Sequence, residues 1–172
     1  MVRRLALTGS LIVAVFAFAV PGAALGASSV EVALVGTFTD PSGVVGGAGG
    51  VVAIQGFADD GGLVAEGVAT YSLCIPNVDP KNCLATLTQA VTIPVSSLSA
   101  TCTEATIELA PLTIVSPPSL DGFTLNFDPI EVVFTADTAT TQRSACAIAR
   151  RLDHGVRDAS LARLLNRLLA GL

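Results

Sequence analysis

Apolar and polar side chains alternate along most of the chain between residues 28 and 135, with the two-residue period of a β-strand that buries one face. The alternation is clearest after residue 104. The apolar positions there are Ala105, Ile107, Leu109, Leu112, Ile114, Phe123, Leu125, Phe127, Ile130, Val132 and Phe134. Strands with one apolar and one polar face are typical of antiparallel sheets, whereas parallel strands are usually apolar on both faces. The pattern therefore predicts an antiparallel fold.

Turn signals divide this region into about seven predicted strands. The sequence DDGG at 59–62 predicts a tight hairpin turn. Pro94 falls inside a predicted strand, and because proline has no N–H to donate, it indicates a sheet edge or a bulge. Residues 41–50 contain five glycines. We expect a loop there, since glycine loses the most backbone freedom in a strand. The predicted fold class is mainly β, an antiparallel β-sandwich or barrel.

Near the C-terminal end the period changes to that of a helix. Ala145, Ile148 and Leu152 recur at helical spacing, and Gly155 follows where a helix-ending glycine is expected. Asp158 is a candidate N-cap for a second helix. The apolar stripe of this second helix comprises Leu161, Leu164, Leu165, Leu168 and Leu172. Two short C-terminal helices are thus predicted, and we expect their leucines to pack on the sheet.

The first 26 residues have the pattern of a signal peptide. Arg3 and Arg4 precede an apolar run from Leu5 to Val20, and Ala24-Leu25-Gly26 has the small-x-small form that signal peptidases accept. The run is shorter than the roughly 20 residues that span a membrane, which favours cleavage over an uncleaved anchor. We therefore expect a signal peptide at 1–26, an antiparallel β domain at 27–142, and an amphipathic helical tail at 143–172 packed on it. The mature protein is expected to be secreted or held in the cell envelope.

Four cysteines remain after the predicted cleavage: Cys74, Cys83, Cys102 and Cys146. An even number in an exported chain predicts disulfides, and three connectivities are possible. Cys74 and Cys83 bracket a short turn rich in Pro, Asn and Asp, which favours a local bridge and leaves Cys102 to pair with Cys146. Because the chain has no CxxC pair and a single histidine, we expect no zinc site.

Charge is divided unevenly along the chain. Residues 27–142 include twelve acidic residues and one basic residue, Lys81. Residues 143–172 include six arginines and two aspartates. An acidic body does not suit a nucleic-acid binder. The basic tail could face an anionic lipid or a surface protein. The candidate partner-facing residues are Arg150, Arg151, Arg157, Arg163 and Arg167.

No set of residues with catalytic spacing emerges from the sequence. His154 sits at a predicted helix end, where a cationic side chain is favoured without any catalytic role. Two carboxylate pairs, Asp59 with Asp60 and Glu104 with Glu108, leave a glycoside hydrolase as a remote alternative. The aspartates in turns suit calcium chemically, but we favour the explanation that local backbone hydrogen bonds account for their position. These are Asp40, Asp59, Asp60, Asp79, Asp121 and Asp128. We expect no catalytic residue, cofactor or metal.

Several short sequences, in this order and spacing, resemble a family of small exported bacterial proteins found mainly in actinobacteria. They are VGTFTD, GLVAEGVAT, QAVTIPVSSLS, ELAPLTI, DGFTLNFDPIEVVFTAD, CAIARRLD and LARLLNRLL. The resemblance implies export, a β-rich body and a bridge between Cys102 and Cys146, and it implies no activity. TATTQRSAC, before the last cysteine, replaces the Gly-Asn-Leu-Leu repeat common in such relatives, so the first helical turn is expected to fray or to pack differently.

These observations lead to a functional hypothesis and two alternatives. The first is a non-enzymatic secreted or envelope-associated β-domain with a structural or binding role. One alternative is a peripheral lipid-binding module that uses the basic C-terminal helices. The other is the carboxylate-dependent hydrolase. The oligomeric state is not predicted by the sequence.

Overall fold

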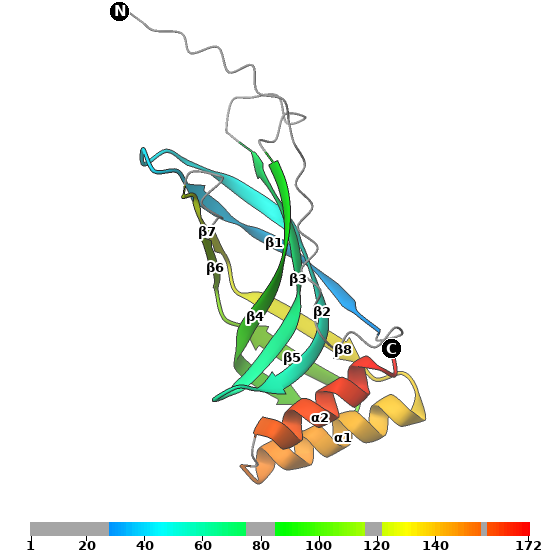
Figure 1. The fold of residues 1–172 in the computed structure, drawn as a ribbon. Coiled ribbons are helices and arrows are strands. Elements are labelled where there is room, and N and C mark those ends of the chain that lie inside the picture. Colours follow the sequence, from blue (N-terminus) through cyan, green and yellow to red (C-terminus); the bar gives the residue numbers. More distant parts are fainter. Residues whose placement is uncertain (1–27, 75–84, 116–121, 156–157) are drawn as a thin grey trace, which may run out of the picture.

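The computed structural model describes residues 28–74, 85–115, 122–155 and 158–172. It contains eight strands followed by two helices (Figure 1). The elements are β1 (Val30–Thr39), β2 (Val45–Asp59), β3 (Leu63–Cys74), β4 (Ala85–Ala100), β5 (Glu104–Leu109), β6 (Leu112–Val115), β7 (Thr124–Phe127), β8 (Ile130–Thr135), α1 (Ala139–Asp153) and α2 (Asp158–Leu169). Among these residues, no helix is long and apolar enough to cross a membrane.

All eight strands belong to one antiparallel sheet that curls into a half-barrel, in the order β6-β7-β1-β2-β3-β4-β5-β8. The prediction of a mainly β, antiparallel fold with two C-terminal helices is confirmed, but the count of about seven strands is wrong. The extra strand comes from the break at Pro111, which separates β5 from β6; together with the break at Pro129, it divides one long hairpin into four short strands.

This divided hairpin connects the two sides of the sheet. One half, β5 with β8, pairs with β4, and the other half, β6 with β7, pairs with β1. Pro111 and Pro129 lie at the two breaks. Two backbone hydrogen bonds, each 2.9 Å long, fix the break points. The Ala110 N–H donates to the Pro94 carbonyl, and the Asp128 N–H donates to the Val35 carbonyl. The hairpin therefore reaches both edges of the β1–β4 meander.

Pro94 lies where β4 changes partner. The residues before it pair with β3, those after it pair with β5, and a bulge follows between Val95 and Ser97. Proline is tolerated at this position because the ladder is already interrupted there. The predicted turn at 59–62 is also present: Asp60 N–H donates to the Gly62 carbonyl at 2.9 Å, and Gly61 has a φ of 69°.

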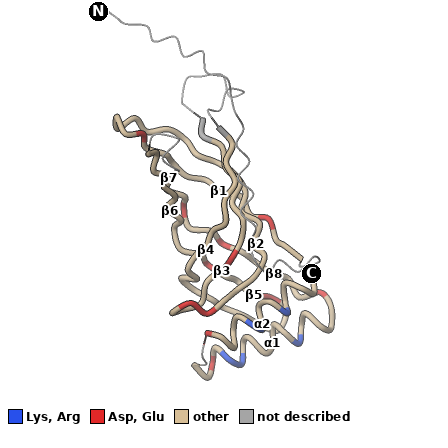
Figure 2. The backbone as a smooth tube through the Cα atoms, in the orientation of Figure 1, with Lys and Arg blue, Asp and Glu red and all other residues tan. Residues whose placement is uncertain are grey.

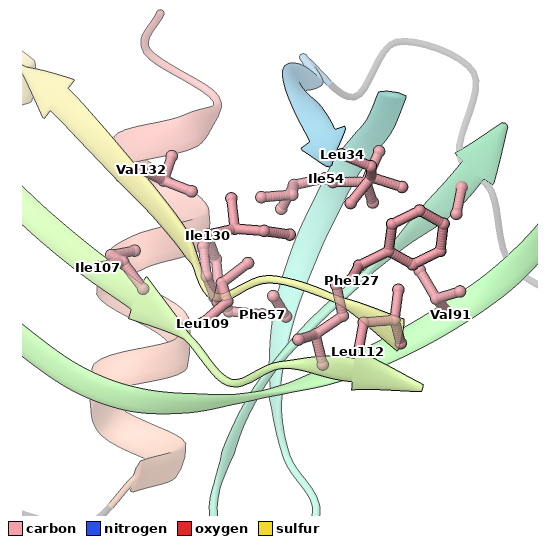
Figure 3. Close-up of a cluster of buried hydrophobic side chains, with 14 of the residues drawn as sticks. Leu34, Ile54, Phe57, Val91, Ile107, Leu109, Leu112, Phe127, Ile130 and Val132 are labelled. Atoms are coloured by element: carbon pink, nitrogen blue, oxygen red, sulfur yellow. The ribbon is translucent and has the colours of Figure 1, made fainter. Parts of the chain in front are cut away.

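The inner face of the half-barrel forms the core, shown in part in Figure 3. Leu34, Val52, Ile107, Leu125 and Val132 are at most 3% exposed and come from five different strands. The alternation of apolar and polar residues in the sequence therefore identifies the inward-facing residues correctly. Aromatic rings from strands that are not adjacent in the sheet meet in the interior: the ring centroids of Tyr71 on β3 and Phe127 on β7 are 5.8 Å apart in an edge-to-face arrangement.

The glycine-rich segment 45–50 is part of β2, so the prediction of a loop there is wrong. A Cβ atom on Gly46 would overlap the ring of Phe38, and one on Gly50 would overlap the Thr70 carbonyl and come within 2.6 Å of the Tyr71 Cα. Glycine is required at these positions because neighbouring rings and backbone occupy the space of a side chain. Close packing thus offsets the entropy cost on which the prediction relied.

The first helix begins earlier than the sequence suggested. α1 starts at Ala139 and not after residue 142, and Thr138 caps it. Thr138 Oγ1 accepts from the Thr141 N–H at 3.1 Å, and Thr141 Oγ1 accepts from the Thr138 N–H at 3.0 Å. This reciprocal pair satisfies two backbone donors at the helix start, in place of the more usual Glu or Gln partner. The expected fraying of the first turn is therefore not observed.

Candidate functional site

The two C-terminal helices lie across one end of the half-barrel, and we call them the helical lid (Figure 1). The apolar stripe of α2 faces inward: Leu161, Leu165 and Leu168 are buried, and Leu164 is partly buried. The structure departs from the predicted stripe at its end, because Leu172 lies beyond α2 and is 56% exposed, while Leu169 is buried in its place. The leucines thus pack against the protein itself.

Asn166 joins the lid to the sheet through a pair of hydrogen bonds to one residue of β2. The Phe57 N–H donates to Asn166 Oδ1 at 2.7 Å, and Asn166 Nδ2 donates to the Phe57 carbonyl at 2.9 Å. β1 ends its pairing with β2 at Ile54, three residues before Phe57, and a bulge lies between Ile54 and Gly56. The amide therefore satisfies backbone groups that none of the described strands reaches on that side.

Sequence reasoning missed Asn166, although a signal existed. Ala162, Leu165, Asn166 and Leu169 fall at positions i, i+3, i+4 and i+7, which share one face of a helix. An asparagine on an otherwise apolar face is a poor helix former and a polar group near the core. That combination indicates a specific hydrogen-bond partner on the opposing element.

A disulfide between Cys102 and Cys146 provides the second link between lid and sheet. Cys102 lies between β4 and β5, and Cys146 lies in α1; their Cα atoms are 4.1 Å apart and their sequence separation is 44. This confirms the predicted pairing of these two cysteines. The other predicted pair, Cys74 with Cys83, falls outside the described residues, since the side chain of Cys74 and all of Cys83 are not described.

The basic residues gather on the lid, whereas most acidic residues are spread over the sheet and its turns, with Asp153 and Asp158 at helix ends of the lid (Figure 2). Every arginine or lysine in the described part of the chain lies on α1 or α2. Of the predicted partner-facing residues, Arg150, Arg151, Arg163 and Arg167 are exposed, and Arg157 lies outside the described residues. Arg143, which the sequence analysis did not single out, is also exposed on α1.

Around the disulfide the surface has a shallow depression. It is lined by Cys102, Cys146, Thr103, Gln142, Arg143 and Arg150, together with two alanines. Arg143 and Arg150 lie three residues before and four residues after Cys146, so all three share one face of α1. None of the residues that line the depression, within the described ranges, carries a carboxylate.

The carboxylates considered for catalysis or metal binding lie apart from this depression. Asp59 and Asp60 are exposed in the β2–β3 turn, and Glu104 and Glu108 are exposed on β5. The Glu108 carboxylate accepts from Ser97 Oγ at 3.0 Å. In the described ranges, no three His, Cys, Asp or Glu side chains come close enough to hold a metal ion. His154 is exposed and caps the end of α1, where its backbone N–H donates to the Arg151 carbonyl.

Asp40 illustrates how a turn aspartate is satisfied locally. Its carboxylate accepts from Ser42 Oγ at 2.7 Å and from the Val44 N–H at 2.7 Å. These two hydrogen bonds, that from Ser42 first, lower the pKa of the Asp40 carboxyl below its usual value. The carboxylate therefore stabilises the turn between β1 and β2.

One polar pair lies inside the half-barrel. The Tyr71 hydroxyl donates to Gln89 Oε1 at 3.3 Å, and Tyr71 is 1% exposed. Burial raises the pKa of the Tyr71 hydroxyl, since the phenolate would lose its hydration. The pair fixes the ring against β4 and leaves no buried side-chain polar atom unsatisfied in the described residues.

Three comparisons with known proteins add no relative. No family model matches the chain, no curated protein matches it, and no solved structure matches it.

Proposed function

We propose that this chain is an exported, non-enzymatic β-domain with a structural or binding role outside the cytoplasm or in the cell envelope. The observation that carries the proposal is the Cys102–Cys146 disulfide, which joins the lid to the sheet. Such bridges persist in oxidising compartments and are rare in reducing ones. The signal-peptide pattern of the first 26 residues supports the same location independently.

The packing of the domain supports a scaffold more than a catalyst. The inner face is filled by buried aliphatic and aromatic side chains, and the candidate carboxylates are exposed on turns and on the outer face of a strand. General acids and bases usually need a cleft that shifts their pKa. The outer surface, and above all the lid, is the part of the described molecule that can meet a partner.

Expression of the full chain in a bacterial host tests the proposal. We expect the protein in the periplasm or medium, an N-terminus at Ala27 or Ser28, and a mass that shows Cys102 and Cys146 blocked to alkylation until a reductant is added. Recovery from the cytoplasm with the first 26 residues attached and both thiols free would contradict it. Turnover of a substrate that a single substitution abolishes would contradict the non-enzymatic part.

A second candidate function is peripheral association with an anionic envelope surface. The observation that favours it is the exposure of Arg150, Arg151, Arg163 and Arg167 on the lid. Because the leucines of α2 are buried against the sheet, such binding would be electrostatic, without insertion of the helix. Binding to vesicles of anionic lipid at low salt, lost at about 0.5 M salt and absent with zwitterionic lipid, would support it; flotation that resists salt would contradict it.

A further inference from the structure

We propose that the Cys102–Cys146 disulfide is a site of thiol–disulfide exchange that selects low-mass thiols carrying a negative charge. The first observation is access. Cys102 is exposed and Cys146 is partly buried, and both line the same surface depression. A disulfide that only stabilises a core is usually shielded from thiols, whereas an accessible one can be attacked.

The second observation is charge. Arg143 and Arg150 line the depression on the same face of α1 as Cys146. Two guanidinium groups attract an anionic thiol to the site, and they favour the thiolate form of the sulfur that leaves. The rest of the domain is acidic, with twelve acidic residues and one basic residue between residues 27 and 142. This depression is therefore a local site of attraction for an anion.

The exchange is balanced by one incoming and one outgoing thiolate. The sulfur of the incoming thiolate attacks Cys102 Sγ, which is on the exposed residue, and forms a new S–S bond with it. The bond between Cys102 Sγ and Cys146 Sγ breaks, and its electron pair leaves on Cys146 Sγ. The product is a mixed disulfide at Cys102 and a thiolate at Cys146 beside the two arginines. No further oxidant or reductant is needed.

Exchange would change the attachment of the lid without removing it. Cys146 no longer links α1 to the β4–β5 connection once the mixed disulfide forms. α1 is still packed through Ala145 and Ile148, both 0% exposed, and α2 is still held by Asn166. The site is therefore suited to a reversible modification of a folded protein.

The test compares the oxidised mature protein with three thiols: 2-mercaptoethanesulfonate (anionic), 2-mercaptoethanol (neutral) and cysteamine (cationic). Acid quenching and peptide mass spectrometry give the rate and position of each mixed disulfide, expressed per thiolate. We expect the anionic thiol to react roughly tenfold faster than the cationic one at low salt, with most of that preference lost at 0.5 M salt, and the adduct on Cys102.

The decisive variant is R143Q/R150Q, which should lose most of the preference for the anionic thiol. Its matched control is T37E/T88E, which changes the net charge equally at exposed sites on the sheet and should keep the preference. Equal rates for the three thiols would overturn the proposal, and so would an adduct on Cys146 or an equal loss in both variants. Circular dichroism establishes that each variant is folded.

Discussion

The side-chain amide of Asn166 pairs with the backbone of Phe57 as a neighbouring strand would, accepting from its N–H and donating to its carbonyl. These residues are 109 positions apart in sequence. Because β2 extends beyond the end of β1, the amide takes the place of missing strand residues. The lid is thereby positioned on β2 by directional bonds as well as by leucine packing.

Substitution of Asn166 by alanine should lower the free energy of unfolding by about 1–3 kcal/mol, since the Phe57 N–H and carbonyl lose their partner. Urea unfolding followed by circular dichroism measures the change. Asn126→Ala is the matched control, because among the described residues its side chain bonds only an exposed threonine, Thr113. We expect it to cost under about 0.5 kcal/mol, and equal losses in the two variants would show that Asn166 has no special role.

Removal of the Cys102–Cys146 bridge by a double serine substitution should cost about 4 kcal/mol in the chain-entropy model, given the 44-residue separation. The corresponding loss at Cys74 and Cys83, predicted from sequence to close a much shorter loop, should be about 2.6 kcal/mol in the same model. Thermal unfolding of the two double variants gives the ranking. Equal melting temperatures would contradict either this ranking or the local pairing.

Gly46 and Gly50 should not tolerate alanine, whereas Gly47, in the same strand, should. A Cβ on Gly46 would overlap the Phe38 ring, and one on Gly50 the backbone around Tyr71, but nothing lies within 4 Å of a Cβ at Gly47. We expect losses of about 1–3 kcal/mol at the first two positions and little change, or a small gain, at the third. If all three variants melt alike, the glycines are not required for packing.

Leu165→Ala should destabilise the domain by about 2–5 kcal/mol, because Leu165 is 0% exposed on the inward face of α2. Leu172→Ala removes the same atoms from a residue that is 56% exposed, and it should be nearly neutral. Denaturant titration of both variants checks the comparison. A small effect at Leu165 would mean that α2 does not close the core.

Tyr71 is the only tyrosine and the chain has no tryptophan, so absorbance at 295 nm follows its ionisation directly. Burial raises its pKa in the folded protein. We therefore expect a titration midpoint above 10 in buffer and near 10 in urea. Since the raised pKa favours the neutral form, this contribution to stability is present below pH 10 and is lost as the pH rises through the folded pKa. A midpoint of 10 in the folded protein would contradict the buried position.

Much of the fold can be predicted from local patterns of the sequence. The alternation after residue 104 identifies the inward residues because one face of each strand is buried, and the leucine stripe identifies α2 for the same reason. The Cys102–Cys146 pair follows from the cysteine spacing once a local bridge is assumed at Cys74 and Cys83.

The features of the fold that could not be predicted from the sequence depend on contacts between distant segments. Glycine is required at position 46 because the ring of Phe38, on another strand, occupies the space of a side chain. Asn166 has a backbone partner on β2 because the pairing of β2 with β1 ends before Phe57. The early start of α1 depends on a threonine pair, Thr138 with Thr141, that differs from the common capping sequence. The depression beside the disulfide arises only when α1 approaches the β4–β5 connection.

The divided hairpin has a consequence for biogenesis. Gly36 of β1 pairs with Phe127 of β7, and β2 meets α2, so the first strands complete their contacts only with the last third of the chain. A chain that crosses a membrane from its N-terminus cannot finish this core until nearly all of it has emerged. If the chain is exported as we propose, this topology delays folding until translocation is almost complete, so the polypeptide stays unfolded while it crosses the membrane.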